Sequence, residues 1–348
     1  MSEQNFTAKD VTVAVLNYNG VDKIPDLFAS IERLTTPPAE VIMVDDGSTD
    51  FSTQWVQEHH PHVRIITFPR NTGMLNVVRN ASLKEAKTDL VFILDNDVVL
   101  LKDCLEKALV AMNTMPDATV CATRAVHEED PDRIYQDGQL LHYVGASPNI
   151  NRDKTIAEAD TEPRLSIGWG VQLINRKRSA IVGWFNEEYF MGWGDDGEFN
   201  HKLNIAGLNC YHVPASVVIH KRHTSSKRYF GTVTNRWRFI LEMYHIKTLF
   251  LVSPALLLYE LLLMAFLVMK GSLCDYFRGM MHFAKNIKRI LAERKKIQAR
   301  RMIPDRQLIG NGDIFVYTDE FSSPVLTVGY KMMNFLFNSY WQIIRKLI

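Results

Sequence analysis

Short apolar runs alternate with helix-like stretches over the first hundred residues. The runs occupy residues 11–16, 41–44, 64–68 and 90–94. Between the first two, residues 24–34 carry apolar side chains at helical spacing. A second helix-like stretch passes through residues 55–56, and a third helix is expected to end near residue 86. Short, continuously apolar strands that alternate with helices predict a parallel sheet covered on both faces.

The pattern changes near residue 230, where strands give way to long apolar and basic segments with helical periodicity. We therefore predict an α/β domain over residues 1–235 and a helical region over residues 236–348. A further strand before this change is predicted at residues 217–219 and is followed directly by His220.

The predicted helical region has three apolar segments. Residues 248–269 are long enough to cross a bilayer, but Glu260 lies near their middle, where a carboxylate costs about 3 kcal/mol. Residues 276–291 carry an apolar stripe with basic residues beside it, which predicts one basic amphipathic helix at a membrane interface. Residues 325–348 are again apolar and aromatic. Peripheral attachment to the cytoplasmic face of the membrane is favoured, and a single crossing or packing among the helices are the alternatives.

Charge is distributed unevenly along a nearly neutral chain. The sequence has 40 Lys and Arg and 39 Asp and Glu, so bulk charge gives no support for a nucleic-acid partner. Residues 270–306 nevertheless hold eleven basic and three acidic residues, which predicts either a solvated face or a partner, for which an anionic membrane surface is expected. The 47% hydrophobic and 23% charged residues exclude a disordered or multi-span class. Four scattered cysteines fit a reducing cytoplasm.

Polar clusters follow the predicted strands, and ligands of open α/β sheets bind at these carboxyl ends. Asp95-Asn96-Asp97 could hold a hard divalent cation, or it could be a strand-end turn. Asp195-Asp196 lies among glycines before a helix, where a carboxylate could act as a general base or could stabilise the helix N-terminus. His220 is a metal-ligand candidate or an ordinary buried histidine.

The order of these motifs resembles that of a known enzyme family. The motifs are Asn17-Tyr18-Asn19-Gly20, the acidic loop 44–50, Asn71-Thr72-Gly73 with Arg79-Asn80, Asp95-Asn96-Asp97, residues 192–199 and Ile219-His220. Over about residues 11–226 they resemble family 2 inverting glycosyltransferases with the GT-A fold, a Rossmann-like nucleotide-diphospho-sugar transferase fold. They are most similar to rhamnosyltransferase-like enzymes of bacterial surface polysaccharide synthesis. Asp195-Asp196 departs from the family's usual Glu-Asp.

The resemblance implies a hexosyltransferase-type enzyme with a nucleotide-sugar site. Its residues would be Asn17, Tyr18, Asp45, Asp46, Arg79 and Asp95. Tyr18 would stack on the base, Asp46, with Asp45 as a second acceptor, would accept its ring N–H, and Asp95 would lie near the ribose. Arg79 would either assist the leaving group or pair with a nearby carboxylate.

The resemblance also implies a metal site and a base. Asp97 and His220 would hold Mg²⁺ or Mn²⁺ against the donor diphosphate, and Asp196, with Asp195 as the alternative, would deprotonate the acceptor hydroxyl. A polyprenyl-diphosphate-linked glycan is the expected acceptor.

Two other functions remain open at this point. A sugar nucleotidyltransferase could share the sheet and a metal carboxylate, although the turn at Asn17 lacks the glycine-rich triphosphate loop that such an enzyme needs. A catalytically silent scaffold that docks polysaccharide-pathway proteins would tolerate loss of the acidic residues, all of which are present.

Overall fold

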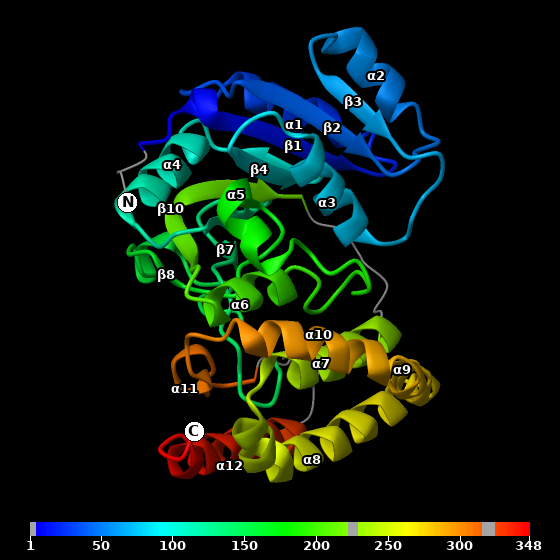
Figure 1. Cartoon of the computed structure of the whole chain (residues 1–348), viewed down its shortest axis with the longest axis vertical. Coiled ribbons are helices and arrows are strands. Elements are labelled where there is room, and N and C mark those ends of the chain that lie inside the picture. The colour runs from blue at the N-terminus through cyan, green and yellow to red at the C-terminus, as the bar shows by residue number, and fades with distance from the viewer. Residues whose placement is uncertain (1–4, 222–228, 315–323) are drawn as a thin grey trace.

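A ten-stranded sheet forms the body of the molecule, and helices cover both of its faces (Figure 1). The computed structural model describes residues 5–221, 229–314 and 324–348. Its main strand order is β3-β2-β1-β4-β9-β6-β10-β5, with β7 beside β6 and β8 beside β10. The strands are β1 (Val11–Asn17), β2 (Glu40–Asp45), β3 (Arg64–Thr67), β4 (Leu90–Asp95), β5 (Val98–Leu100), β6 (Val120–His127), β7 (Ile134–Gln136), β8 (Arg164–Leu165), β9 (Gln172–Asn175) and β10 (Cys210–His220).

Two apolar cores lie on opposite faces of this sheet. Alternate residues of β1 point to different faces, so Val13 packs with α1 and α4 while Ala14 packs with α3 and α6. This two-sided burial explains the continuous apolar runs in the sequence. The helices of this part are α1 (Ile24–Glu32), α2 (Ser52–His59), α3 (Leu75–Glu85), α4 (Cys104–Thr114), α5 (Arg176–Ser179) and α6 (Gly197–Ile205).

The sheet is mixed rather than wholly parallel as predicted. Strands β1, β2, β3 and β4 are parallel to one another, but β9 lies antiparallel between β4 and β6. Only four residues make up β9, too few for a periodicity in the sequence to reveal its direction.

The C-terminal helices form two layers below the sheet (Figure 1). Helices α7 (Tyr229–Met243) and α10 (Ile287–Ala299) lie next to α6, whereas α8 (Ile246–Met269) and α12 (Pro324–Ile344) lie farthest from the sheet. Helices α9 (Leu273–Lys285) and α11 (Asp305–Leu308) complete the region. Helix α7 runs across the predicted division at residue 235, so that division stays a prediction. Residues 1–4 and 222–228 of the predicted first domain lie outside the described residues.

The single amphipathic helix predicted over residues 276–291 is two helices. Helix α9 ends before Asn286, whose side-chain amide donates to the carbonyl oxygen of His282 at 2.9 Å. The Asn286 side chain thus shares the His282 carbonyl oxygen with the Asn286 backbone N–H, so it competes for a hydrogen-bond acceptor of the helix at the point where the helix ends. The apolar stripe is thereby divided between α9 and α10.

Glu260 faces the protein interior, not lipid or water. Its carboxylate pairs with Arg236 of α7 and accepts a hydrogen bond from the Tyr276 hydroxyl of α9 at 2.7 Å. Arg236 also donates to the carbonyl oxygen of Val144 in the sheet domain. Glu260, in the middle of α8, therefore joins α8 to α7 and α9.

The outer face of the lower layer is apolar and exposed. Phe250, Leu257 and Leu261 of α8 are 80%, 64% and 53% exposed, and Phe335 and Ile343 of α12 are each 68% exposed. Helix α8 is long and apolar enough to cross a membrane, with about a quarter of its most apolar stretch buried. Tyr340 of α12 donates to the carbonyl oxygen of Leu251, so the two helices pack together.

We predict that Glu260→Ala lowers the free energy of unfolding by about 3 kcal/mol, because it leaves Arg236 buried without its counter-charge. Chemical denaturation followed by circular dichroism measures this loss. Glu293→Ala, which removes an ion pair to the exposed Lys296, is the control and should have an effect typical of surface substitutions. Equal losses in the two variants would contradict the structural role of Glu260.

Candidate active site

The carboxyl ends of β1, β2 and β4 meet at one edge of the sheet. In the strand register, Asn17 lies opposite Asp45, and Leu16 lies opposite Asp95. The polar clusters that follow these strands therefore converge, as the sequence predicted.

Asn17 connects three strand-end loops. Its side-chain amide donates to Asp45 Oδ1 and to Ser52 Oγ, each at 2.8 Å, and its Oδ1 accepts from Asn96 Nδ2 at 3.0 Å. At Gly20, a Cβ atom would lie 2.3 Å from Asn96 Nδ2, so this close approach requires a glycine. The buried Asn17 thus sets the relative positions of the loops.

Tyr18 and Asp46 belong to the part of this edge that could receive a nucleobase. Tyr18 is 48% exposed. The two carboxylate oxygens of Asp46 accept hydrogen bonds from the backbone N–H and the hydroxyl of Thr72, both at 3.0 Å. A pocket of about 520 Å³, lined by residues 68–72, adjoins these groups. Asp45 and Asp46 are both buried, and Asp46 is the acid that is bonded to the pocket lining, through Thr72.

A buried ion pair lies behind the strand ends. Arg79 Nη1 of α3 is 3.0 Å from Asp195 Oδ2, and the two side chains are 3% and 7% exposed. Asn76, one turn earlier on α3, accepts from Arg79 Nη1 at 2.9 Å and donates to the Asp195 backbone oxygen at 2.8 Å. The structure therefore shows Arg79 paired with a nearby carboxylate, which is one of the two roles expected for it.

Asp95 approaches the same guanidinium. At Gly170, a Cβ atom would lie 2.8 Å from Asp95 Oδ2 and 3.1 Å from Arg79 Nη2, so a side chain at residue 170 would press on both groups. Burial, with the charges of Asp97 and Asp195, raises the pKa of Asp95 to about 6, although Arg79 opposes this rise.

Asp196 begins helix α6, where its Oδ1 accepts from Gly197 N at 2.7 Å. Burial and the adjacent charge of Asp195 raise the pKa of Asp196 to about 7, against the opposing effect of Arg79. The Asp196 residue is nevertheless partly exposed to solvent, whereas Asp195 is buried. A reachable carboxylate with a pKa near neutrality is suited to accept a proton.

Strand pairing brings Asp97 and His220 together. Val98, the residue after Asp97, is paired with His220 across β5 and β10. Asp97 Oδ1 lies 3.9 Å from His220 Nε2, and both side chains are partly exposed. Among the described residues, no group of three or more His, Cys, Asp or Glu side chains could hold a metal ion by itself. One carboxylate and one imidazole still fit a cation that takes its other ligands from phosphate and water.

The His220 ring is held by aromatic neighbours that the sequence analysis did not identify. Tyr135 of β7 stacks on it with a centroid separation of 4.4 Å and an interplanar angle of 11°, and Trp169 lies 6.0 Å away. No motif marks Tyr135, because it enters the site from a three-residue strand.

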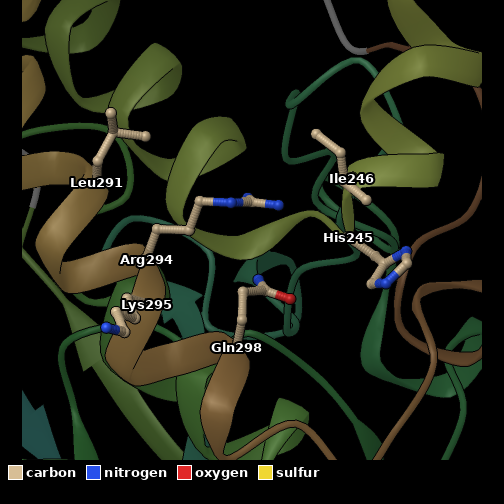
Figure 2. Close-up of a pocket in the computed structure, with 6 residues that line it drawn as sticks. All are labelled: His245, Ile246, Leu291, Arg294, Lys295 and Gln298. Atoms are coloured by element: carbon tan, nitrogen blue, oxygen red, sulfur yellow. The ribbon is translucent and has the colours of Figure 1, made fainter.

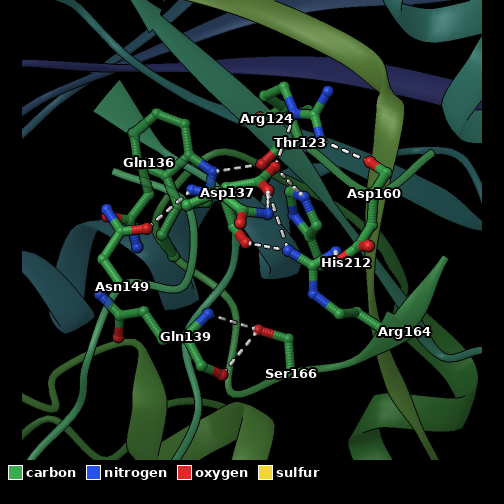
Figure 3. A network of polar contacts seen from close by, with 12 residues as sticks. Thr123, Arg124, Gln136, Asp137, Gln139, Asn149, Asp160, Arg164, Ser166 and His212 are labelled. Carbon is green, nitrogen blue, oxygen red and sulfur yellow. Dashed lines mark hydrogen bonds and ion pairs between the residues drawn. The ribbon is translucent and has the colours of Figure 1, made fainter. Parts of the chain in front are cut away.

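A buried polar network fixes the chain next to Tyr135 (Figure 3). Asp137 accepts from Arg124 Nε at 2.6 Å, from His212 Nε2 at 2.7 Å and from Arg164 Nη2 at 2.9 Å. Burial alone would raise the pKa of Asp137, but the bonds from His212 and Arg124 hold this pKa well below its usual range. The ionised carboxylate thereby joins β6, β8 and β10 to the end of β7.

Comparison with known proteins identifies the domain. Residues 12–179 match the family model described as glycosyl transferase family 2. Residues 12–179 therefore form a family 2 glycosyltransferase domain. This finding confirms the predicted enzyme class and the predicted GT-A fold, which is that of the solved relatives.

Three relatives illustrate how far the similarity of this glycosyltransferase extends. The N-acetylglucosaminyl-diphospho-decaprenol L-rhamnosyltransferase of Mycobacterium tuberculosis is 25% identical over 246 residues, which cover 62% of this chain and 77% of that protein. The poly(ribitol-phosphate) beta-N-acetylglucosaminyltransferase TarS of Staphylococcus aureus is 26% identical over 159 residues, covering 37% of this chain and 28% of TarS. The crystal structure of GalNAc-T7 with UDP, GalNAc and Mn²⁺ superimposes with a TM-score of 0.55 at 17% identity, covering 69% of this chain and 49% of GalNAc-T7.

We predict that Asp97→Ala abolishes metal-dependent nucleotide binding without unfolding the chain, because it removes the carboxylate of the Asp97–His220 pair. Titration calorimetry with UDP, dTDP or GDP, with and without Mn²⁺, measures the loss. Asp89→Ala is the control, since Asp89 lies at the opposite end of β4 and pairs with Lys177 at the surface. Unchanged metal-dependent affinity in Asp97→Ala would show that this motif is a turn.

Proposed function

We propose that the protein is a metal-dependent, inverting glycosyltransferase. It transfers a sugar from a nucleotide-diphosphate donor to a hydroxyl of a lipid-linked glycan during cell-surface polysaccharide synthesis. The observation that carries this proposal is the arrangement at the sheet edge, where the partly exposed Asp196 adjoins the ion pair between Asp195 and Arg79, and Arg79 belongs to the residues 12–179 that match the family 2 glycosyltransferase model.

Asp196 acts as the general base in this proposal. It accepts the proton of the acceptor hydroxyl while the acceptor oxygen forms a bond to the anomeric carbon and the bond to the nucleoside diphosphate breaks. One displacement from the face opposite the leaving group inverts the anomeric configuration. Asp195 is less suited to this role, because Arg79 holds its carboxylate in a buried ion pair.

The donor lies across the strand ends. Tyr18 stacks on the base, Asp46 accepts a ring N–H, and Asp95 lies near the ribose, while Asn17 and Asp45 fix the loops that carry these groups.

Asp97 and His220 hold Mg²⁺ or Mn²⁺, with Tyr135 keeping the imidazole in place. When bound there, such a cation would supply positive charge that neutralises the departing diphosphate.

The acceptor is a polyprenyl-diphosphate-linked glycan presented at the cytoplasmic face of the membrane. The rhamnosyltransferase relative supports this choice, because its name specifies a decaprenol-diphosphate acceptor. The exposed apolar side chains of α8 and α12 lie in the membrane interface, and the basic residues of α9 and α10 face anionic headgroups. Glu260 is turned inward and therefore does not oppose burial of the outer face of α8.

One experiment distinguishes the proposed transferase from a sugar nucleotidyltransferase and from a catalytically silent scaffold. A panel of UDP-, dTDP- and GDP-sugars is tested with Mn²⁺ for release of the nucleoside diphosphate. Release at a saturable rate supports a transferase, exchange with inorganic diphosphate would favour a nucleotidyltransferase, and binding without turnover would favour a scaffold.

We predict that Asp196→Asn lowers transfer by about 10²- to 10⁴-fold, because the amide cannot accept the proton. Donor affinity should be retained, since the substitution preserves the shape of the side chain. Steady-state rates and calorimetric titration with the donor identified by the panel give the two quantities.

Glu187→Gln is the control for Asp196→Asn, since Glu187 is an exposed carboxylate that bonds Asn80. This variant should keep the wild-type rate. Near wild-type transfer by Asp196→Asn, combined with an inactive Asp195→Asn, would reverse the assignment of the base.

We predict that replacing Lys285, Lys288 and Lys295 together by glutamine weakens binding to phosphatidylglycerol vesicles and makes it less dependent on salt. All three are exposed, and a basic residue near an anionic surface contributes about 1 kcal/mol of attraction. Vesicle sedimentation at several salt concentrations measures the effect. Release of nucleoside diphosphate from the soluble donor should not change.

The matched control replaces Lys84, Lys102 and Lys107, which are exposed on the sheet domain, and should bind vesicles like the wild type. Full-length protein that stays in the supernatant with anionic vesicles at low salt would refute peripheral attachment. Cleavage of the C-terminus by a protease added from the periplasmic side would instead favour a single crossing.

A further inference from the structure

Helix α7 belongs to the C-terminal region, yet one of its side chains bonds the loop that precedes Asp195 and Asp196. Asn235 is fully buried. Its amide donates to the backbone oxygens of Phe190 and Trp193 at 2.8 and 2.9 Å, and its carbonyl oxygen accepts from Phe190 N at 3.1 Å. All three bonds reach residues 190–193.

The loop has little regular structure of its own to fix it. Gly192 and Gly194 have φ values of 136° and 79°, in the region that favours glycine, and glycine has the most backbone freedom to lose on folding. Met191 is 37% exposed. The loop therefore depends on bonds from neighbouring elements to keep one conformation.

One face of α7 supplies these contacts. Gly231, Asn235 and Phe239 follow one another at intervals of four residues, which places them in a row on one side of the helix. A Cβ atom at Gly231 would lie 3.1 Å from Phe190 Cβ, and the Phe239 ring meets the Trp193 ring at 5.4 Å in an edge-to-face arrangement.

Helix α7 is itself firmly held. Near its C-terminus, the Arg294 guanidinium donates to the Tyr244 carbonyl oxygen at 2.7 Å, and Gln298 Nε2 donates to those of Glu242 and Met243, each at 3.0 Å. Figure 2 shows Arg294 and Gln298 extending from α10 into a pocket beside His245. These bonds satisfy carbonyl groups that the end of a helix leaves unpaired, and they hold this end of α7 in place.

The direction of the Asp196 carboxylate follows from the backbone near it, because it accepts from the adjacent Gly197 N–H. Asn76 and Arg79 hold Asp195 from the sheet domain, whereas Asn235 holds residues 190–193 from α7. Loss of the Asn235 bonds would free the preceding loop and let Asp196 move relative to the donor.

We propose that Asn235 is a positioning residue, which fixes loop 190–193 and thereby sets the orientation of the general base Asp196. This inference rests on the proposed function, since it requires Asp196 to be the base. It also makes the C-terminal helices a structural part of the catalytic site.

Asn235→Ala in the full-length protein tests the proposal. We expect kcat for nucleoside diphosphate release to fall about 10- to 100-fold, with donor KM changed less than about threefold, because a base displaced by about 1 Å loses rate rather than donor affinity. The assay uses the UDP-, dTDP- or GDP-sugar that the panel identifies. Hydrogen exchange in the peptide spanning residues 187–197 should become faster.

Thr234→Val is the matched control on the same helix. Thr234 is buried and its hydroxyl contacts the Gly279 carbonyl oxygen of α9 at 3.3 Å, on a different side from the loop. This variant should lose some stability while keeping kcat and the exchange rate of the loop. An equal fall in kcat in both variants, or a proportional loss of donor affinity in Asn235→Ala, would overturn the proposal.

A double variant separates this inference from the proposed function. If Asn235 acts through Asp196, Asn235→Ala should cost little further rate in an Asp196→Asn background. Full additivity of the two losses would refute the inference alone, whereas an active Asp196→Asn single variant would refute the assignment of the base.

Should Asn235→Ala fail to fold, Asn235→Asp keeps the size and the acceptor for Phe190 N–H but loses the donated bonds, and the same kcat loss is expected.

Discussion

The site is organised around one buried cation, the Arg79 guanidinium. A buried carboxylate is costly unless it is paired, and Asp95, Asp195 and Asp196 all lie within the electrostatic reach of this group. Arg79 pairs directly with Asp195, and this ion pair compensates for the burial of the carboxylate. The charge of Asp195 in turn raises the pKa of Asp196, so the ion pair differentiates two adjacent carboxylates that the sequence cannot tell apart.

The proposed base, Asp196, lies between two structural units. From the sheet domain, Asn76 and Arg79 hold Asp195, and from the C-terminal helices, Asn235 bonds the loop ahead of it. The Arg236–Glu260 pair joins α7 to α8, a helix with an exposed apolar face. In this account, a helical layer suited to a membrane surface is continuous with the catalytic site through α7.

The sequence predicts the parts of the structure in which local pattern determines the outcome. Continuous apolar runs located β1 to β4, and the polar residues after them converge because parallel strands end at the same edge. The direction of β9 was not predictable, because a strand of four residues is too short to show a periodicity. The break at Asn286 was not predictable either, because the apolar pattern of residues 276–291 does not reveal the side-chain hydrogen bond at Asn286.

The same limit applies within the site. Asp97 and His220 were chosen from motifs, and strand pairing brings them together. Tyr135, Gly170 and Asn235 carry no motif, because their roles depend on contacts between residues that are distant in the sequence. Asn76 lies three residues before Arg79 on a predicted helix, so helical spacing was a signal that could have identified it.

The central claim is that Asp196 titrates near neutrality and works as a carboxylate. The most direct test is the pH dependence of kcat/KM for the wild-type enzyme, measured at saturating Mn²⁺ and compared with Asp196→Asn. Because protonation removes the base, the account predicts that kcat/KM falls tenfold per pH unit below about pH 7. The residual kcat/KM of Asp196→Asn should lack this pH dependence. A wild-type rate that stays constant down to the ordinary pKa of a carboxylate, or an acidic limb that persists in Asp196→Asn, would contradict it.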